Sequence, residues 1–329
     1  MKFRATSLFL FLVLCLNGTV VRAQTPTLKL GLASLSMFTI IPHVAQDKGF
    51  FQKEGVNVEI NHFESGSINM KALLARAVDV SDVETGLILG AAVGGADLRL
   101  IGTHSQRLHF ALYAKNEIKN LKDLYGRNFG ISGIGGLPHL VILALMDQQC
   151  LDPSKINMLT VGGTGARLTA LAAGKIDATL GEYSPVIEAQ PGISRLMVVS
   201  PELPLYMAQG VVVWADVLAS KRDALERMQR GLVNATRWAY DNKNELIEVA
   251  RKHLPLSAEE MSRVYDFYTL ARVWAINGEL DPALLVYMQE LGIKTKTQGG
   301  RADLNKLVVL DLVTRTAGAL GTREYSQPR

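Results

Sequence analysis

The chain has 329 residues, 48% of them hydrophobic and 20% charged, and its formal net charge is +4. This length allows a large buried core without support from disulfides, and the chain contains only two cysteines. No basic block or basic patch with interleaved aromatic residues occurs, so the composition does not support nucleic-acid binding.

Residues 1–23 have the pattern of a secretory signal peptide. Lys2 and Arg4 precede an apolar run that ends at Leu16, and the segment ends at Ala23. The run is about half of the roughly 20 residues that a membrane-spanning helix requires. We therefore expect cleavage after Ala23 and export to the periplasm. Cleavage would lower the formal charge from +4 to +1, because Lys2, Arg4 and Arg22 are lost with no acid.

The next segment, residues 28–60, predicts a strand, a polar loop, a helix and a second strand. The loop after the apolar strand LKLGLA carries Ser36, Met37 and Phe38. Ligands of buried parallel sheets lie beyond the carboxyl ends of the strands. We therefore predict these three residues at a ligand site.

The sequence of residues 41–60, IPHVAQDKGFFQKEGVNVEI, resembles the opening of the nitrate/sulfonate/taurine and thiamine-precursor (SsuA/THI5-like) family of periplasmic substrate-binding proteins of ABC transporters. The resemblance implies an α/β, two-lobed periplasmic-binding-protein (type II) fold. Each lobe would be a mixed sheet flanked by helices, with the ligand cleft between the lobes. It also implies a receptor that closes over a small organic molecule and delivers it to an ABC permease in the inner membrane.

Strand and helix patterns alternate through the first two thirds of the chain, and residues 221–291 are almost wholly helical. Two extended apolar stretches, LHFALYAK (108–115) and YMAQGVVVW (206–214), are interpreted as crossings between lobes. The segment between them starts a new βαβ pattern. We therefore predict one lobe from residues 24–107 plus 208–329 and an inserted lobe from 108–207. The predicted strands are 28–33, 56–63, 98–106, 127–132, 155–161, 176–180 and 194–200, and the helices 38–48, 67–77, 84–94, 136–149 and 165–174.

Two further groups of candidate ligand contacts lie in the first lobe. Ser65 and Gly66 follow the second strand, where Ser65 is also suited to cap the next helix. Glu84 and Thr85 begin the helix TGLILGAAVGG, a position that lies at the cleft in the family that the chain resembles. An acid at a helix N-terminus is also favourable without a ligand. Gln209, in the second crossing, can donate and accept hydrogen bonds.

The second lobe offers three loops. In the glycine-rich segment 130–136, Ser132 and Gly133 are candidates, although a plain βα turn also explains the glycines. Thr164 and Arg167 open the next helix. Arg167 would meet a ligand carboxylate or sulfonate, or would simply be solvated. The third loop carries Glu182 and Tyr183, which follow the strand KIDATLG.

The cysteines and histidines show no pattern of metal or covalent chemistry. Cleavage would leave Cys150 as the one cysteine, and its place at the end of HLVILALMDQQC predicts a buried apolar side chain. The six histidines form neither an H-x-H pair nor an H-E-x-x-H motif. We predict no metal site, no cofactor and no catalytic residue.

The balance of charges bears on the ligand. Anion receptors of the family are expected to lack carboxylates near the ligand, whereas here Glu84 and Glu182 oppose a single cation, Arg167. This favours a small organic molecule with hydrogen-bond donors, such as an amino- or ring-containing carboxylate or a pyrimidine, over nitrate or simple sulfonates. An enzyme like the thiamine-pyrimidine synthases remains an alternative on this fold, although their cysteine-rich motif is missing. A ligand-sensing partner protein is another, and a monomer is expected.

Overall fold

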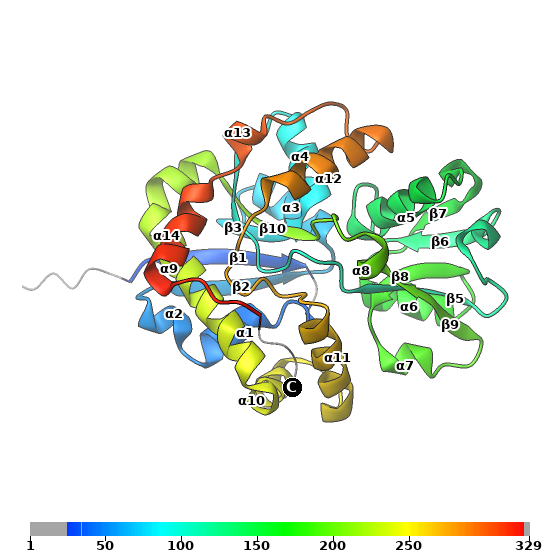
Figure 1. Cartoon of the computed structure of the whole chain (residues 1–329), viewed down its shortest axis with the longest axis horizontal. Helices are drawn as coiled ribbons and strands as arrows, with labels where there is room; N and C mark the ends of the chain where they lie inside the picture. Colours follow the sequence, from blue (N-terminus) through cyan, green and yellow to red (C-terminus); the bar gives the residue numbers. More distant parts are fainter. Residues whose placement is uncertain (1–24, 34, 326–329) are drawn as a thin grey trace, which may run out of the picture.

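The computed structural model describes residues 25–33 and 35–325 (Figure 1). The predicted signal peptide therefore lies outside the described residues. In the described part the strands form two five-stranded sheets, in the orders β2-β1-β3-β10-β4 and β7-β6-β8-β5-β9. The strands are β1 Thr27–Ala33, β2 Asn57–Phe63, β3 Val80–Glu84, β4 Leu98–Gly102, β5 Phe110–Lys115, β6 Asn128–Ile131, β7 Asn157–Thr160, β8 Ala178–Glu182, β9 Ile193–Val198 and β10 Gln209–Trp214.

The two sheets repeat one plan. In each, four strands run in the same direction. The strand in the fourth place arrives from the other half of the molecule and runs antiparallel to both of its neighbours. That strand is β10 in the first sheet and β5 in the second. Each sheet is therefore mixed, and the chain passes between the sheets twice.

The apolar stretches predicted as crossings are mainly inner strands. Residues 110–115 form β5 and residues 209–214 form β10, and both strands are almost completely buried. A continuous apolar run is typical of a strand covered on both faces, which explains the pattern. The connections themselves are the shorter segments 103–109 and 203–208.

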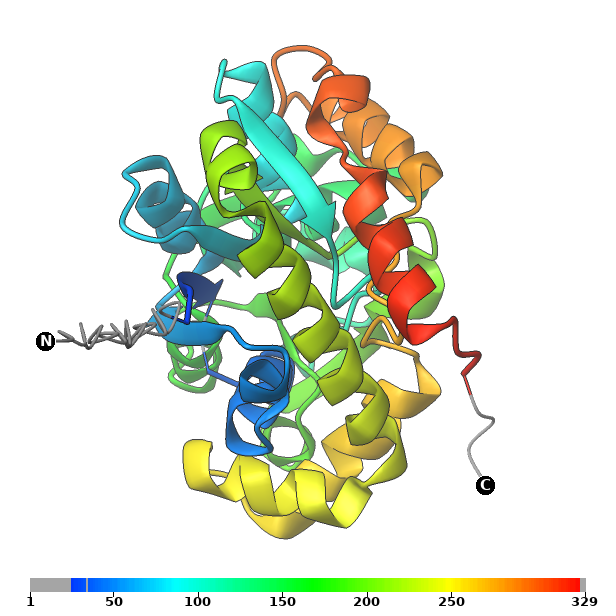
Figure 2. The same cartoon turned by 90° about the vertical axis from the view of Figure 1, so that its left-hand side faces the viewer.

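Helices cover both sheets. We call the first sheet with α1–α4 and α9–α14 the first lobe, and the second sheet with α5–α8 the second lobe; Figure 1 shows them side by side. Figure 2 shows the long α9 running obliquely across the first lobe beside α14. The helices are α1 Ile41–Asp47, α2 Phe50–Lys53, α3 Gly66–Leu74, α4 Thr85–Val93, α5 Leu137–Gln148, α6 Thr164–Ala172, α7 Pro185–Glu188, α8 Val199–Glu202, α9 Ala215–Asp241, α10 Lys243–His253, α11 Ala258–Leu270, α12 Pro282–Lys294, α13 Leu304–Leu307 and α14 Leu310–Leu320.

Local features of the sequence explain several helix ends. Pro42 lies in the first turn of α1, and Gly49, with a φ of 72°, separates α1 from α2 in the left-handed conformation that glycine tolerates. The Ser65 hydroxyl accepts a hydrogen bond from the Ile68 N–H and so caps α3. The helical last third is interrupted between α11 and α12, where Trp274 is completely buried.

The prediction of a buried Cys150 is wrong. Helix α5 ends at Gln148, and Cys150 lies past this end with a φ of 54° and an exposed side chain. The left-handed residue turns the chain away from the helix axis. The apolar periodicity of the helix therefore does not extend to residue 150.

The lobes touch each other on both sides of the space between the sheets. On one side, α4 and α5 approach so closely that a Cβ at Gly86 would overlap the Leu140 side chain. On the other side, the Glu182 side chain at the end of β8 accepts a hydrogen bond from the Tyr268 hydroxyl of α11 at 3.4 Å. The structure is therefore that of a closed two-lobed molecule.

Candidate functional site

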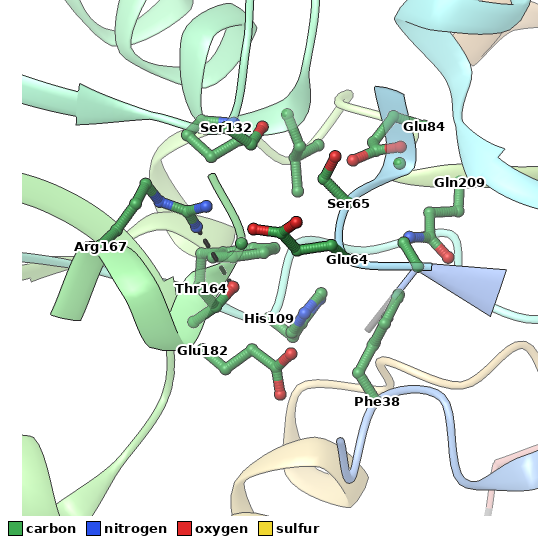
Figure 3. A pocket seen from close by; sticks show the side chains of 16 residues that line it. Phe38, Glu64, Ser65, Glu84, His109, Ser132, Thr164, Arg167, Glu182 and Gln209 are labelled. Carbon is green, nitrogen blue, oxygen red and sulfur yellow. Dashed lines mark hydrogen bonds between the residues drawn. The ribbon is translucent and has the colours of Figure 1, made fainter. Parts of the chain in front are cut away.

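A cavity lies between the lobes, at the carboxyl ends of β1, β3, β6 and β8 (Figure 3). This is the edge at which the sequence predicts ligand contacts. The predicted residues that the structure brings together in its wall are Phe38, Ser65, Gly66, Glu84, Ser132, Thr164, Arg167, Glu182 and Gln209.

The other five predicted residues lie near this cavity rather than in its wall. Ser36, Met37 and Tyr183 line a second, adjoining cavity. Thr85 is completely buried at the start of α4, and Gly133 lies against the Ser67 side chain. The loop after β1 and the loop after β8 thus serve two cavities.

Glu84 brings a buried carboxyl group to the first lobe's side of the cavity. Burial is the main cause that raises its pKa to about 7, and Asp82 adds to the rise. The rise in pKa is opposed by the backbone N–H groups of Glu84 and Leu137 and by the charge of Arg167. The Glu84 Oε2 atom is buried without a hydrogen-bond partner among the described residues. This carboxyl can therefore lose or hold a proton near neutral pH.

Glu182 brings a second such group from the opposite lobe. Burial raises its pKa to about 7, against the hydrogen bonds from Ser36 and Tyr268 and the charge of Arg167. Both of these hydrogen-bonding residues belong to the first lobe, so the Glu182 carboxyl also links the lobes. Figure 3 shows Glu84 and Glu182 on opposite sides of the cavity, with Glu64 between them.

Arg167 is the cation of the site, and it is buried rather than solvated. Its guanidinium donates to the carbonyl oxygens of Gly162 (2.6 Å) and Leu180 (3.0 Å) and to the hydroxyls of Thr164 and Thr179. Burial lowers its pKa to about 10, so it stays charged at neutral pH. Most of its donors are used within the second lobe. Arg167 therefore acts mainly as a fixed positive charge.

An aromatic stack closes one side of the cavity. The Phe38 and His109 rings are nearly parallel, with centroids 3.6 Å apart, and the Phe110 ring lies 4.2 Å from the His109 ring at an angle of 46°. Burial lowers the pKa of His109 well below its usual range, so the ring is neutral. Sequence reasoning missed His109 because it lies inside the apolar run LHFALYAK. The one sequence feature that could have indicated His109 as a cavity residue was its place in a predicted crossing between the lobes.

The glycine-rich loop 132–136 contributes shape as well as a hydroxyl. Gly135 has a φ of 77°, and its N–H donates to the His139 Nδ1 atom at 3.0 Å. A Cβ at Gly136 would contact the Ser132 hydroxyl oxygen at 2.5 Å. These glycines therefore allow Ser132 to reach the cavity.

Polar atoms without partners gather around this space. Buried polar atoms in proteins are normally paired, because an unpaired one costs about 1–3 kcal/mol. Unpaired donors and acceptors of both lobes that surround one cavity are suited to a polar small molecule. The atoms without a hydrogen bond to the described residues include Ser67 Oγ, Glu84 Oε2, Thr85 Oγ1, Ser132 Oγ and Gln209 Oε1.

The described residues contain no group of three or more histidine, cysteine, aspartate or glutamate side chains placed to hold a metal ion. In the same part of the chain, no helix is both long and apolar enough to cross a membrane.

Two mixed sheets joined by two crossings, with a polar cavity between them, define the periplasmic-binding-protein fold. Solved structures support this fold. The alkanesulfonate-binding protein SsuA from Xanthomonas axonopodis pv. citri, bound to MOPS, superposes with a TM-score of 0.74 at 16% identity, covering 87% of this chain and 99% of that one. The nitrate-binding protein NrtA from Synechocystis PCC 6803 gives 0.75 at 14% identity, covering 91% and 90%.

Residues 39–246 match the family described as NMT1/THI5 like, and the chain belongs to this family. A protein of Brucella abortus (strain 2308) is 25% identical over 261 residues, which cover 76% of this chain and 79% of the relative. Its name describes an inferred role as a binding protein. YtlA of Bacillus subtilis (strain 168), named in the same way, is 25% identical over 189 residues, 56% of this chain and 55% of the relative. Both names describe an inferred binding role, which supports a solute-binding role for this chain.

Proposed function

We propose that the chain is a periplasmic receptor that closes its lobes over a small organic molecule bearing hydrogen-bond donors and delivers it to an ABC permease in the inner membrane. Residues 1–23 would direct export and be removed. The lobes would be residues 24–107 plus 208–329 and residues 108–207, and the receptor would act as a monomer.

One observation carries the proposal: carboxyl groups from opposite lobes, Glu84 and Glu182, face one cavity and both have a pKa near 7. A ligand with N–H donors can hydrogen-bond to both carboxylates and hold the lobes together. Closing the lobes around it would expel water and strengthen these bonds. Arg167 is one positive charge against three acids, Glu64, Glu84 and Glu182, so the cavity is better suited to a donor-bearing or cationic group than to a bare anion.

The test begins with a thermal-shift screen of the exported protein, from Gln24 onward. The panel comprises amines, amino acids, pyrimidines, aromatic and aliphatic carboxylates, sulfonates and nitrate. A ligand at about a hundred times its Kd adds roughly 2.7 kcal/mol to the free energy of unfolding, which raises the melting temperature clearly. We expect the hits to carry N–H donors.

Calorimetric titration of Glu84→Gln and Glu182→Gln with the strongest hit then tests the role of the acids. Each substitution should weaken binding at least about tenfold, since a hydrogen bond to a charged group is worth about 1.5–3 kcal/mol. Glu117→Gln, at an exposed position, is the matched control and should leave the Kd unchanged. Full affinity in both site variants, or hits confined to nitrate and sulfonates, would contradict the proposed recognition.

A further inference from the structure

A second cavity, of about 250 Å³, adjoins the first one. It lies between α7 of the second lobe and the start of α11 of the first lobe. Thr164 and Glu182 line both cavities, so these side chains stand between the two spaces. A molecule that passes Glu182 would extend from one cavity into the other.

The two cavities differ in chemistry. Large apolar side chains that are unusually exposed gather in the second cavity: Leu35 is 40% exposed, Val186 42% and Leu256 36%. They come from both lobes, since Leu35 and Leu256 belong to the first and Val186 to the second. Contiguous exposed apolar side chains on a soluble protein mark a binding surface. Closure of the lobes is what brings these three together.

Two large polar side chains of the second cavity, Tyr183 and Glu260, are already engaged. Glu260 accepts a hydrogen bond from the Ser257 N–H at 2.6 Å and thereby caps α11. The Tyr183 ring packs on Phe267, with ring centroids 4.6 Å apart. The second cavity therefore offers mainly carbon surface, while the buried carboxyl groups and the unpaired polar atoms lie in and around the first.

We propose that the second cavity binds the apolar tail of the same solute whose donor-bearing head lies between Glu84 and Glu182. This inference rests on the proposed function and narrows its substrate class to amphiphiles: an amine head with an alkyl or aromatic tail. The tail leaves the first cavity past Thr164 and Glu182. It lies against Leu35, Val186 and Leu256 and so excludes water from both lobes at once.

A series of n-alkylamines from butylamine to decylamine tests this arrangement by titration with the exported protein. Each methylene that enters the second cavity should raise affinity by up to about fourfold. The gain should stop once the tail fills the cavity. Val186→Asp and Leu256→Asp, at half-exposed positions that the fold tolerates, should both flatten the dependence on chain length.

Val286→Asp is the matched control. It introduces the same change at a residue of similar exposure, 49%, on α12 away from both cavities. The control should keep the wild-type dependence on chain length. Equal affinity across the series in the wild-type protein, or an undiminished dependence in both cavity variants, would overturn the proposal.

The failure of this inference is distinguishable from the failure of the proposed function. If the broad screen gives donor-bearing hits but the alkylamine series is flat, the receptor stands and the tail site is wrong. If neither the screen nor the series binds, both are wrong. A dependence on chain length that the second-cavity variants abolish supports both.

Discussion

Gly66 lies directly against the carboxylate of Glu84, so closely that a Cβ at residue 66 would overlap the carboxylate carbon and oxygens. Gly66 is the first residue of α3, whose N-terminus favours a nearby negative charge. Burial nevertheless raises the pKa of Glu84 to about 7, so the cost of desolvating the carboxylate exceeds its stabilisation by the helix N-terminus. The missing side chain at residue 66 therefore sets the place of the carboxyl group at the cavity.

The substitution Gly66→Ala should displace Glu84 and weaken ligand binding. We expect a loss of about 1–3 kcal/mol in the free energy of unfolding, typical of an overpacked site, and a weaker Kd for the screened ligand. Denaturant unfolding and calorimetric titration measure the two effects. Gly90→Ala, in α4, is the control and should be neutral or slightly stabilising, because no atom lies within 4 Å of the place its methyl group would take. Unchanged binding by Gly66→Ala would refute this role.

The pH dependence of stability should reveal the buried carboxyl groups. The folded-state pKa of Glu84 is about 7, above its usual 4.5, so the folded protein holds a proton that the unfolded chain has lost. This proton therefore contributes fully to the free energy of unfolding below about pH 4.5. The contribution, up to about 3 kcal/mol, is lost as the pH rises through 7. Glu84→Gln, which stays neutral, should gain stability relative to wild type between pH 5 and pH 8.

The pH dependence of the free energy of unfolding must be compared between variants, because the titration of other groups changes this free energy in the opposite direction. Burial lowers the pKa of His43 to about 4, so its contribution to stability is lost as the pH falls from 6.5 through 4. Urea unfolding of wild type, Glu84→Gln and the exposed control Glu117→Gln at pH 5 and pH 8 isolates the effect. An equal stability difference between Glu84→Gln and wild type at both pH values would show that Glu84 ionises normally.

Much of the site was predictable because of where the strands end. Glu84 and Glu182 are the last residues of β3 and β8, and this position puts each side chain at the carboxyl edge of its sheet. The two-lobed fold followed from the resemblance at residues 41–60 and from the new βαβ pattern after residue 120. Such features depend on neighbours in the sequence, which a pattern can reveal.

The features that sequence reasoning missed depend on residues that are distant in the chain. His109 belongs to the cavity because it stacks on Phe38, and nothing local to either residue indicates this contact. The first-turn position of Arg167 favours a solvated cation, and only the structure shows that β8 supplies the Leu180 carbonyl and the Thr179 hydroxyl as partners. Cys150 was misjudged because a helix end cannot be located to within two residues from periodicity.

Arg167→Lys should destabilise the second lobe although it keeps the charge. The guanidinium bonds four groups in different directions, and a single ammonium group cannot reach them all. Buried carbonyl groups would lose their donors, at a cost of about 2–4 kcal/mol. Arg263→Lys, at an exposed position of α11, is the control and should change the free energy of unfolding by less than about 0.5 kcal/mol. Equal melting temperatures for both variants would contradict this structural role.

Closure of the lobes should depend on the absence of a side chain at Gly86. A methyl group there would overlap Leu140 across the lobe interface, so Gly86→Ala should hold the lobes apart. The open form has no such overlap, and alanine favours the helix by about 0.5–1 kcal/mol. Affinity should therefore fall at least about tenfold while the free energy of unfolding of the unliganded protein stays the same or rises.

The double variant Gly86→Ala/Leu140→Ala separates closure from other effects of the new methyl group. Removing the Leu140 side chain makes room for it, so the double variant should recover much of the affinity that Gly86→Ala loses, although Leu140→Ala alone costs stability. Small-angle scattering with saturating ligand should give a larger radius of gyration for Gly86→Ala than for wild type. If Gly86→Ala binds and compacts like wild type, the contact between α4 and α5 does not control closure.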